Sequence, residues 1–286
     1  MNKFSLGTAN FGKIYGKGVG NVKVPPNEIK KILRYLKINK LNFLDTALIY
    51  KNEKILRKEN LKNWKITTKL PKIITKKNSN IKKIVTNYIE SFLKKIKSKN
   101  FYGLLLHDTS DLFNSQSDTL YKILISLKKK KIIKKIGVSV YDPKELDILL
   151  KKYKIDIVQL PLNVLDRRFA KLGYLKKLKS LGIEIHARSI FLQGLLILKE
   201  EEMPLRFKKW KKTWNEWNVW IKKNKVSKLE ACISYVKSIP EVDKIVVGVN
   251  NVIQLREIIS VFKKNKKINF KKNFNYTRKL INPRSW

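Results

Sequence analysis

The stretch Leu44-Asp45-Thr46-Ala47-Leu48-Ile49-Tyr50 decides the fold, because a short apolar run that includes Leu41 and Phe43 ends there in a carboxylate. Such a run is typical of a buried strand. A phenol follows five residues after the carboxylate. In a parallel α/β fold, the side chains that follow the strands meet at the carboxyl edge of the sheet. We therefore expect Asp45 and Tyr50 to reach one place at that edge.

Two later strand-like runs also end in polar side chains. The run Trp64–Lys69 ends in an ammonium group, and the run Phe101–His107 ends in an imidazole. The ends of consecutive parallel strands lie side by side, so the carboxylate, phenol, ammonium and imidazole are expected to meet in one pocket. Taken singly, each group also has a simpler explanation, as a helix cap, a half-buried aromatic ring, a surface lysine or a strand-end histidine.

Short apolar runs alternate with longer amphipathic, lysine-rich stretches along the whole chain, which predicts alternating strands and helices. The expected strands are Phe4–Leu6, Asn42–Thr46, Trp64–Lys69, Phe101–His107, Lys135–Val140, Asp156–Leu160, Ile183–Ser189 and Lys244–Val249. The expected helices lie near Asn27–Lys37, Asn52–Glu59, Asn80–Lys97, Ser117–Lys130, Pro143–Lys152, Tyr174–Ser180, Val226–Ser238 and Asn251–Phe262. Eight β/α units in order predict a single α/β domain over residues 1–286, a closed (β/α)8 barrel, which takes about 250 residues.

Local signals refine this alternation at three places. Asp142 and Ser139 are typical helix caps, and Pro143 suits a first helical position. Four tryptophans in Lys199–Asn224 share one helical face, so this segment either packs on the barrel wall or forms a lid over the pocket. The tail over residues 265–286 ends in an aromatic residue after a proline, and it either folds back over the barrel or frays.

The chain is strongly basic, with 65 Lys+Arg against 22 Asp+Glu and a net charge of +43. Such a charge is expected of proteins that bind nucleic acids or anionic membranes. However, only nine of the basic residues are arginines, and the lysines are spread along the chain beside many Ile and Asn, which is the bias of an A+T-rich coding sequence. We therefore predict a solvated lysine-rich surface and no specific nucleic-acid partner; steeply salt-dependent binding would indicate the alternative.

Composition and cysteine use indicate a folded cytoplasmic protein. The chain is 43% hydrophobic, and its one cysteine, Cys232, excludes an intramolecular disulfide. The first seven residues, Met1–Gly7, lack the apolar core of a signal peptide, and no stretch approaches about 20 apolar residues. We expect neither secretion nor membrane insertion, and a monomer.

The four expected pocket residues have complementary chemistry for carbonyl reduction. A phenol with a pKa near 10 donates a proton poorly until a nearby cation stabilises the phenolate. Lys69 supplies that cation, and Asp45 would hold it through a charge-assisted hydrogen bond. His107 would hydrogen-bond the oxygen that Tyr50 protonates. No metal site is expected.

With these residues in place, the chain resembles the aldo-keto reductase superfamily over essentially its whole length. The matching segments, in order, are Leu6-Gly7-Thr8-Ala9-Asn10-Phe11-Gly12, Asp45-Thr46-Ala47 with Tyr50, Thr67-Thr68-Lys69, Leu104-Leu105-Leu106-His107, Ile136-Gly137-Val138-Ser139, Val158-Gln159 with Asn163, Ala187-Arg188-Ser189 with Gln193-Gly194, and Val246-Val247-Gly248-Val249. The resemblance implies a barrel that binds NADPH across its carboxyl face, and a catalytic tetrad of Asp45, Tyr50, Lys69 and His107 with Tyr50 as general acid.

The resemblance also implies a cofactor site. Ser139 and Gln159 would hydrogen-bond the nicotinamide amide, and Arg188 would lie against the nicotinamide ring beside Ser189. The remaining cofactor residues would be Gly248, Asn250, Asn251 and Gln254, in the loop after the eighth strand. In that loop the family commonly grips the 2′-phosphate with basic residues, whereas this chain offers neutral amides with Arg256 nearby, so NADH remains possible.

Two readings of function follow. The first is a nicotinamide-dependent oxidoreductase that interconverts a small-molecule carbonyl and its alcohol. The second is a catalytically inactive barrel that binds a nucleotide or a protein partner, and the intact tetrad argues against it. Basic residues near the expected pocket favour an anionic or sugar-like substrate: Lys13, Lys17, Lys23, Arg167 and Arg168.

Overall fold

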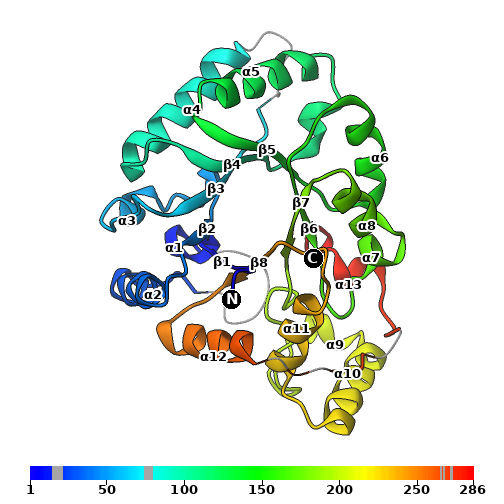
Figure 1. The fold of residues 1–286 in the computed structure, drawn as a ribbon. Helices are drawn as coiled ribbons and strands as arrows, with labels where there is room; N and C mark the ends of the chain where they lie inside the picture. The colour runs from blue at the N-terminus through cyan, green and yellow to red at the C-terminus, as the bar shows by residue number, and fades with distance from the viewer. Residues whose placement is uncertain (15–21, 74–79, 265, 267, 271–272) are drawn as a thin grey trace.

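A computed structural model describes residues 1–14, 22–73, 80–264, 266, 268–270 and 273–286. Eight parallel strands pair in chain order, and the first also pairs with the last, so the sheet closes into a barrel (Figure 1). The strands are β1 (Phe4–Gly7), β2 (Phe43–Asp45), β3 (Lys65–Leu70), β4 (Phe101–Leu106), β5 (Ile133–Ser139), β6 (Ile157–Pro161), β7 (Glu184–Arg188) and β8 (Lys244–Gly248).

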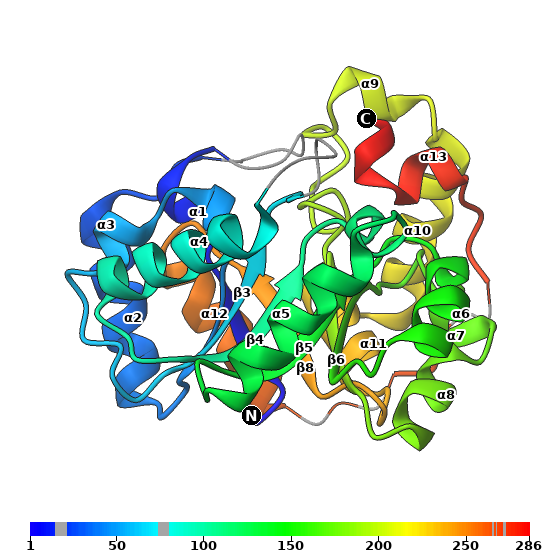
Figure 2. The ribbon, with the colours of Figure 1, turned by 90° about the horizontal axis from the view of Figure 1, so that it is seen from above.

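Helices surround the barrel, and short helical turns follow several strands (Figure 2). The helices are α1 (Ala9–Gly12), α2 (Pro26–Ile38), α3 (Glu53–Leu56), α4 (Ile81–Ile96), α5 (Ser117–Lys129), α6 (Pro143–Lys152), α7 (Arg168–Lys171), α8 (Tyr174–Ser180), α9 (Leu205–Lys208), α10 (Lys211–Asn224), α11 (Lys228–Lys237), α12 (Val252–Lys263) and α13 (Arg278–Ile281). The 3-10 turns are η1 (Leu48–Tyr50), η2 (Thr109–Leu112) and η3 (Pro283–Ser285).

The predicted (β/α)8 barrel is confirmed, with small shifts in where elements begin and end. Asp142 caps α6 in a capping box with Glu145, as its sequence signal indicates. Ser139 is not a helix cap, because it is the last residue of β5 and pairs with Gln159 of β6. The predicted helix over Asn52–Glu59 is only the single turn α3.

The outer layer forms because each long helix turns one apolar face toward the sheet. In α4, Val85, Ile89 and Phe92 are buried at the helical spacing of three and four residues. Phe92 meets Phe101 of β4 with ring centroids 5.9 Å apart. Burial of each such side chain stabilises the fold by about 1.5–3 kcal/mol.

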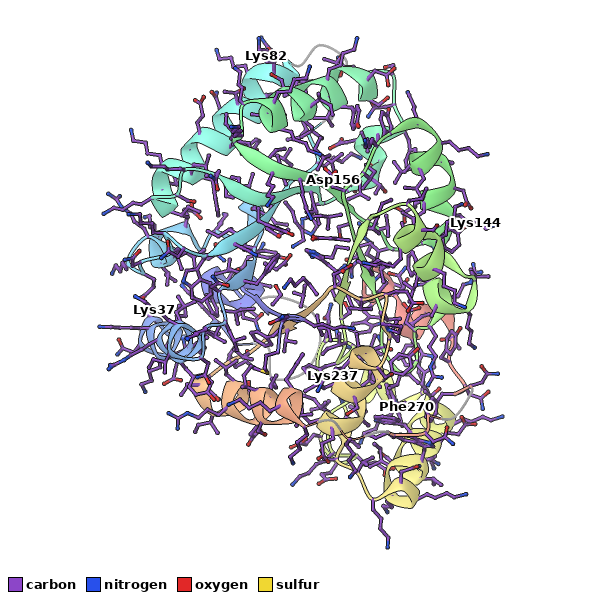
Figure 3. All side chains as sticks on the ribbon, viewed as in Figure 1. Lys37, Lys82, Lys144, Asp156, Lys237 and Phe270 are labelled. Atoms are coloured by element: carbon purple, nitrogen blue, oxygen red, sulfur yellow. The ribbon has the colours of Figure 1, made fainter. Side chains whose placement is uncertain are left out.

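The lysines lie mostly on the outside of this layer. Figure 3 shows Lys37, Lys82 and Lys144 extending away from the molecule on three different sides. This spread matches the solvated lysine-rich surface that the sequence predicts, since no single face collects the charge of these three residues. No helix in the described part of the chain is long and apolar enough to cross a membrane.

The tryptophan-rich segment forms α10, whose buried indoles pack against the loop after β7 and against the tail. Trp214, Trp217 and Trp220 are buried, and the Trp217 indole N–H donates a hydrogen bond of 3.0 Å to the Leu196 carbonyl. Trp217 and Trp220 stack with ring centroids 5.5 Å apart. These contacts make the packed helix the better description of the tryptophan face.

The described part of the tail returns to the carboxyl end of the barrel. Leu280 and Ile281 of α13 are buried, and the Trp286 ring lies 4.8 Å from that of Phe207 in α9. In Figure 2, α13 and the C-terminus lie at one end of the barrel beside α9, whereas the N-terminus lies at the opposite end. The tail therefore lies where the strands end.

We predict that Gly12→Ala disrupts the loop that carries Tyr50. A Cβ atom at Gly12 would lie 2.0 Å from the Tyr50 carbonyl oxygen and 2.6 Å from the Lys51 carbonyl carbon, so the backbone must move. The free energy of unfolding, measured by urea denaturation, should fall by about 1–3 kcal/mol. Gly248→Ala is the matched control, because its Cβ would meet only the Gly7 oxygen at 4.0 Å. Equal stability of the two variants would contradict the prediction.

Candidate active site

A cavity of about 680 Å³ opens at the carboxyl ends of the strands. The register of the sheet explains why polar side chains gather there: Gly7 pairs with Asp45 on one side and Gly248 on the other, and Ser139 pairs with Gln159. All four predicted catalytic residues, Asp45, Tyr50, Lys69 and His107, line the cavity. The barrel thus brings together side chains from β2, β3 and β4 and the loops that follow them.

A buried ion pair forms the floor of this cavity. The Lys69 Nζ atom lies 2.6 Å from Asp45 Oδ1 and donates a second hydrogen bond of 3.0 Å to the Thr46 carbonyl. The Gln159 amide donates a hydrogen bond of 2.7 Å to the other carboxylate oxygen, Asp45 Oδ2. Buried charges are tolerated when they are paired and their remaining hydrogen-bonding groups are satisfied, which is the case here. Burial lowers the pKa of Lys69, and Asp45 opposes this shift.

Tyr50 and His107 lie above the ion pair. The Lys69 ammonium is 5.8 Å from the centroid of the Tyr50 ring, and the Tyr50 and His107 rings meet edge to face at 6.3 Å. The imidazole lies on the same side of the cavity, beside the phenol.

His107 is neutral at pH 7. Burial, followed by the positive charges of Lys69, Arg188 and Arg284, lowers its pKa to about 3. A neutral imidazole carries one N–H donor, so His107 is suited to hydrogen-bond an oxygen without itself adding charge.

Asn52 positions the turn that presents Tyr50. Its side chain is buried and donates hydrogen bonds to Thr8 Oγ1 at 2.9 Å and to the Thr8 carbonyl at 3.2 Å. Between Tyr50 and Asn52, Lys51 adopts a left-handed conformation with φ 54°. This anchor ties the turn to the end of β1, and the sequence analysis places Asn52 only at the start of a helix.

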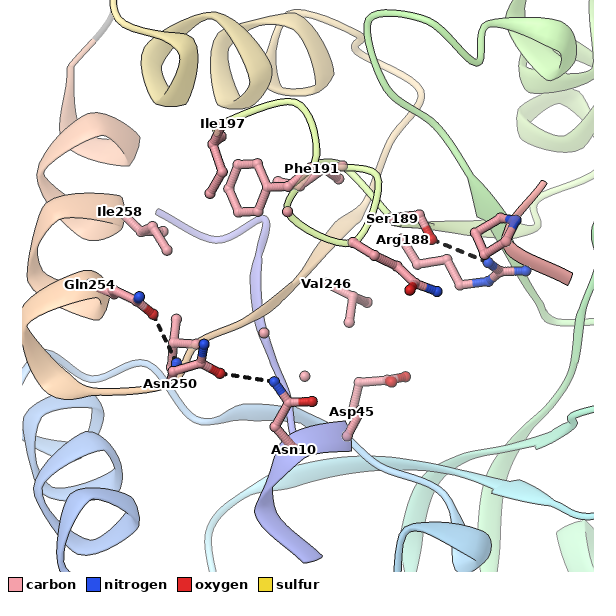
Figure 4. A pocket seen from close by; sticks show the side chains of 18 of the residues that line it. Asn10, Asp45, Arg188, Ser189, Phe191, Ile197, Val246, Asn250, Gln254 and Ile258 are labelled. Atoms are coloured by element: carbon pink, nitrogen blue, oxygen red, sulfur yellow. Dashed lines mark hydrogen bonds between the residues drawn. The ribbon is translucent and has the colours of Figure 1, made fainter. Parts of the chain in front are cut away.

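Seven of the eight predicted cofactor residues line the same cavity: Ser139, Gln159, Arg188, Ser189, Gly248, Asn250 and Gln254. Asn251 does not line it, because it caps α12 and accepts a hydrogen bond from the Gln254 backbone N–H. Figure 4 shows Asn250 and Gln254 at one side of the cavity, with Asp45 and Arg188 farther along it. Asn10 donates a hydrogen bond to Asn250 across this side, at 2.9 Å. An elongated ligand would therefore contact both groups of residues.

The loop after β7 forms a further wall of the cavity. Ser189, Leu192, Gln193 and Gly194 all have positive φ angles, although only one of them is glycine. Left-handed backbone is unfavourable for a branched residue such as leucine, and such strain is concentrated at functional sites. The loop holds Phe191 at the cavity, as Figure 4 shows.

The described basic residues that suggested an anionic substrate are Lys13, Lys23, Arg167 and Arg168, and none of these four lines the cavity. Arg168 forms an ion pair with Asp166, and Arg167 stacks over the Tyr235 ring at 4.6 Å. Lys13 and Lys23 are exposed, and Lys17 lies outside the described residues. Arg256, the cation near the last loop, lies over the Tyr35 ring instead. The described residues of this set therefore give no support for an anionic substrate, and the class of substrate stays a prediction.

The cavity wall contains residues that the sequence analysis did not single out, and Tyr141 is the most prominent. The others that bear on ligand binding are Lys199, Lys228, Glu257 and Pro283. Tyr141 follows β5 after one residue, so the rule that strand ends carry the site would have found it. The tryptophans of α10 are not among the lining residues, which agrees with their role in packing.

The fold and its polar cavity place the protein among the (β/α)8 barrels that gather their functional side chains at the carboxyl ends of the strands. The sequence profile of the Aldo/keto reductase family matches residues 3–275, and the chain belongs to this family. The family is one of oxidoreductases that typically bind nicotinamide cofactors.

Solved structures agree in fold at low sequence identity. An aldo-keto reductase from Bacillus halodurans in its holo form superposes with a TM-score of 0.73 at 17% identity, over 93% of this chain and 88% of that one. A glycerol dehydrogenase from Gluconobacter oxydans superposes with a TM-score of 0.68 at 18% identity, over 93% and 88% of the two chains. No curated protein sequence matches the chain.

The shifted pKa of His107 predicts how stability depends on pH. The pKa is about 3 in the folded protein and near 6.5 in the unfolded chain, so between these values the unfolded chain binds more protons. Stability should therefore fall as the pH drops from 6.5 toward 3, by at most about 1.4 kcal/mol per pH unit from this group. Urea denaturation of the wild type and His107→Gln at about pH 7 and pH 5 should show a shallower dependence in the variant. The same change in the free energy of unfolding between pH 7 and pH 5 in both proteins would contradict the prediction.

Proposed function

We propose that this protein is a nicotinamide-dependent oxidoreductase that interconverts a small-molecule carbonyl and the corresponding alcohol, with Tyr50 as the general acid in reduction. One observation carries the proposal: a fully buried Lys69 ammonium, paired with Asp45, lies beside a phenol and a neutral imidazole in one cavity. An ordinary surface lysine keeps its ammonium group in solvent and would not be buried together with a carboxylate partner.

In this mechanism, the other residues of the site assist the transfer of a proton from Tyr50 to the carbonyl oxygen. Lys69 stabilises the phenolate that remains when Tyr50 gives its proton to the carbonyl oxygen. Asp45 holds Lys69 in place, and Gln159 fixes Asp45 through its second oxygen. Neutral His107 donates a hydrogen bond to the same carbonyl oxygen and so orients the substrate.

The cofactor fits the arrangement of polar groups along the cavity. Ser139, Gln159 and Arg188 would hold the nicotinamide end, and Asn250 with Gln254 would hold the opposite end. When bound, the reduced nicotinamide supplies the hydride. The Gln159 amide nitrogen is engaged by Asp45, which leaves its oxygen oriented by that bond and able to accept from a carboxamide.

We also propose a cytoplasmic location, which the use of cysteine supports, with a single-domain monomer as the working form. Cys232 is buried, and its burial raises the pKa of the thiol, so it is unreactive. A protein with this one buried cysteine requires no oxidising compartment.

Replacing Tyr50 by Phe tests the proposed acid. The substitution removes the proton donor and keeps the ring, so the turnover of a responsive aldehyde with NADPH should fall by about 10²–10⁴-fold. Cofactor affinity, measured by fluorescence quenching, should remain close to that of the wild type.

Tyr88→Phe is the matched control, because Tyr88 is 44% exposed on α4 and lies outside the cavity. Retention of more than about a tenth of the wild-type turnover in Tyr50→Phe would show that another group donates the proton. Failure of the wild type to bind either NADPH or NADH would favour an inactive barrel with a different ligand.

NADPH should bind more tightly than NADH, but only by about tenfold, or roughly 1.4 kcal/mol. The amides of Asn250 and Gln254 serve a phosphate or a ribose hydroxyl equally well, and Lys199 and Lys228 add positive charge to the cavity wall. Part of the preference comes from surface charge that salt screens, so titrations at about 50 and 500 mM salt should show it shrinking. Equal affinity at low salt would mean that the neutral loop decides cofactor choice.

A further inference from the structure

The ring of Tyr141 lies between two arginines at the catalytic end of the cavity. The Arg188 guanidinium carbon is 3.9 Å from the ring centroid, and that of Arg284 is 3.8 Å from it. Two guanidinium groups cannot both occupy the space over one face at this distance, so they lie on opposite faces. We call Arg188 and Arg284 the arginine pair.

The arginine pair is assembled from distant parts of the chain. Arg188 ends β7, Tyr141 follows β5, and Arg284 belongs to η3 in the tail. Burial of Leu280 and Ile281 fixes the tail, and its neighbour Pro283 lines the cavity. The position of Arg284 is thus set by packing of the tail against the barrel.

The positive charge of the pair lacks a contacting carboxylate in the described part of the chain. Among the residues that the structure describes, neither arginine forms an ion pair within 4.0 Å. Arg188 donates only to neutral oxygens, the Val140 carbonyl at 3.0 Å and Ser189 Oγ at 3.4 Å. Asp108 is near enough for Arg284 to lower its pKa, yet the two side chains are not in contact as an ion pair.

The positive charge of the arginine pair acts at the place where the carbonyl would react. Both arginines lower the pKa of His107, so both lie within electrostatic reach of the imidazole. Asp45, one of the carboxylates that line the cavity, is already engaged by Lys69 and Gln159. Arg188 lines this end of the cavity, whereas Arg284 is exposed, is not one of the lining residues, and reaches this end only through its contact with the Tyr141 ring.

We propose that the arginine pair binds an anionic group of the substrate, so that the preferred substrates are aldehydes or ketones that also carry a carboxylate or a phosphate. Guanidinium groups bind both anions through paired N–H donors, and stacking on Tyr141 holds the donors in place before the ligand arrives. The inference rests on the proposed carbonyl reduction and adds the chemical class of the substrate.

The test compares charged and neutral substrates of the same shape in the wild type, Arg284→Ala and Arg284→Lys. One pair is 4-carboxybenzaldehyde and methyl 4-formylbenzoate; the other is glyceraldehyde 3-phosphate and glyceraldehyde. The wild type should prefer at least one of the two charged substrates in kcat/KM, and Arg284→Ala should reduce that preference by about 10- to 100-fold, mainly through KM. Arg284→Lys should retain part of it, because the charge remains while the planar fork is lost.

Arg278→Ala is the matched control, because it removes the same charge from an exposed position of the tail without touching Tyr141. Calorimetry with 4-(hydroxymethyl)benzoate, the alcohol product, and with glycerol 3-phosphate gives a second readout that needs no turnover. Binding of at least one of them should weaken in Arg284→Ala and not in Arg278→Ala.

Three results would overturn the inference: equal use of charged and neutral substrates by the wild type, the same loss of preference in Arg278→Ala, or a loss of NADPH affinity in Arg284→Ala that matches the loss for the substrate. The last would assign Arg284 to the cofactor, together with Arg188, which the proposed function already places at the nicotinamide end. Absence of reduction of every carbonyl, with Arg284-dependent binding of the charged alcohols intact, would instead refute the proposed function and leave the anion site standing.

Discussion

The rest of the site depends on the buried ion pair between Lys69 and Asp45. Two charges taken out of water cost several kcal/mol each, and their attraction offsets this only when the remaining hydrogen-bonding groups are also satisfied. The Thr46 carbonyl and the Gln159 amide meet that condition. The pair constrains β2, β3 and β6 at once, so the chemistry of the site and the register of the barrel share one set of contacts.

The same constraint explains how the less buried parts of the site are arranged. The Tyr50 ring lies near the Lys69 ammonium without taking part in the ion pair. Tyr50 belongs to a separate turn, which the Asn52 side chain anchors through its hydrogen bond to Thr8. Two further cations, Arg188 and Arg284, surround Tyr141 at the edge of the cavity. Burial keeps His107 neutral, and the charges of Lys69 and the two arginines act in the same direction, which makes the imidazole a donor and not a second acid.

The order of the eight strands and the meeting of Asp45, Tyr50, Lys69 and His107 could be predicted from sequence, because both follow from apolar runs that end in polar residues. Arg284 could not be placed, since nothing local indicates which part of the barrel a tail reaches. The contacts of Arg167 and Arg168 could not be predicted, because a sequence does not show which way a charged side chain points: Arg167 stacks on Tyr235, and Arg168 pairs with Asp166. The position of Tyr141 after β5 could have been predicted, but its contacts with Arg188 and Arg284 could not, because both partners lie far away in the chain.

Closure of the sheet between β1 and β8 has a consequence for synthesis of the protein. Phe4 pairs with Ile245 and Gly7 with Gly248, so the first strand lacks one neighbour until about 240 further residues have been made. At ~5–20 residues per second, this interval lasts about 12–50 s. Throughout it, one edge of β1 and the apolar side chains beside it stay open on the nascent chain. A chaperone that covers this edge on the ribosome would protect β1 until β8 pairs with it and closes the barrel.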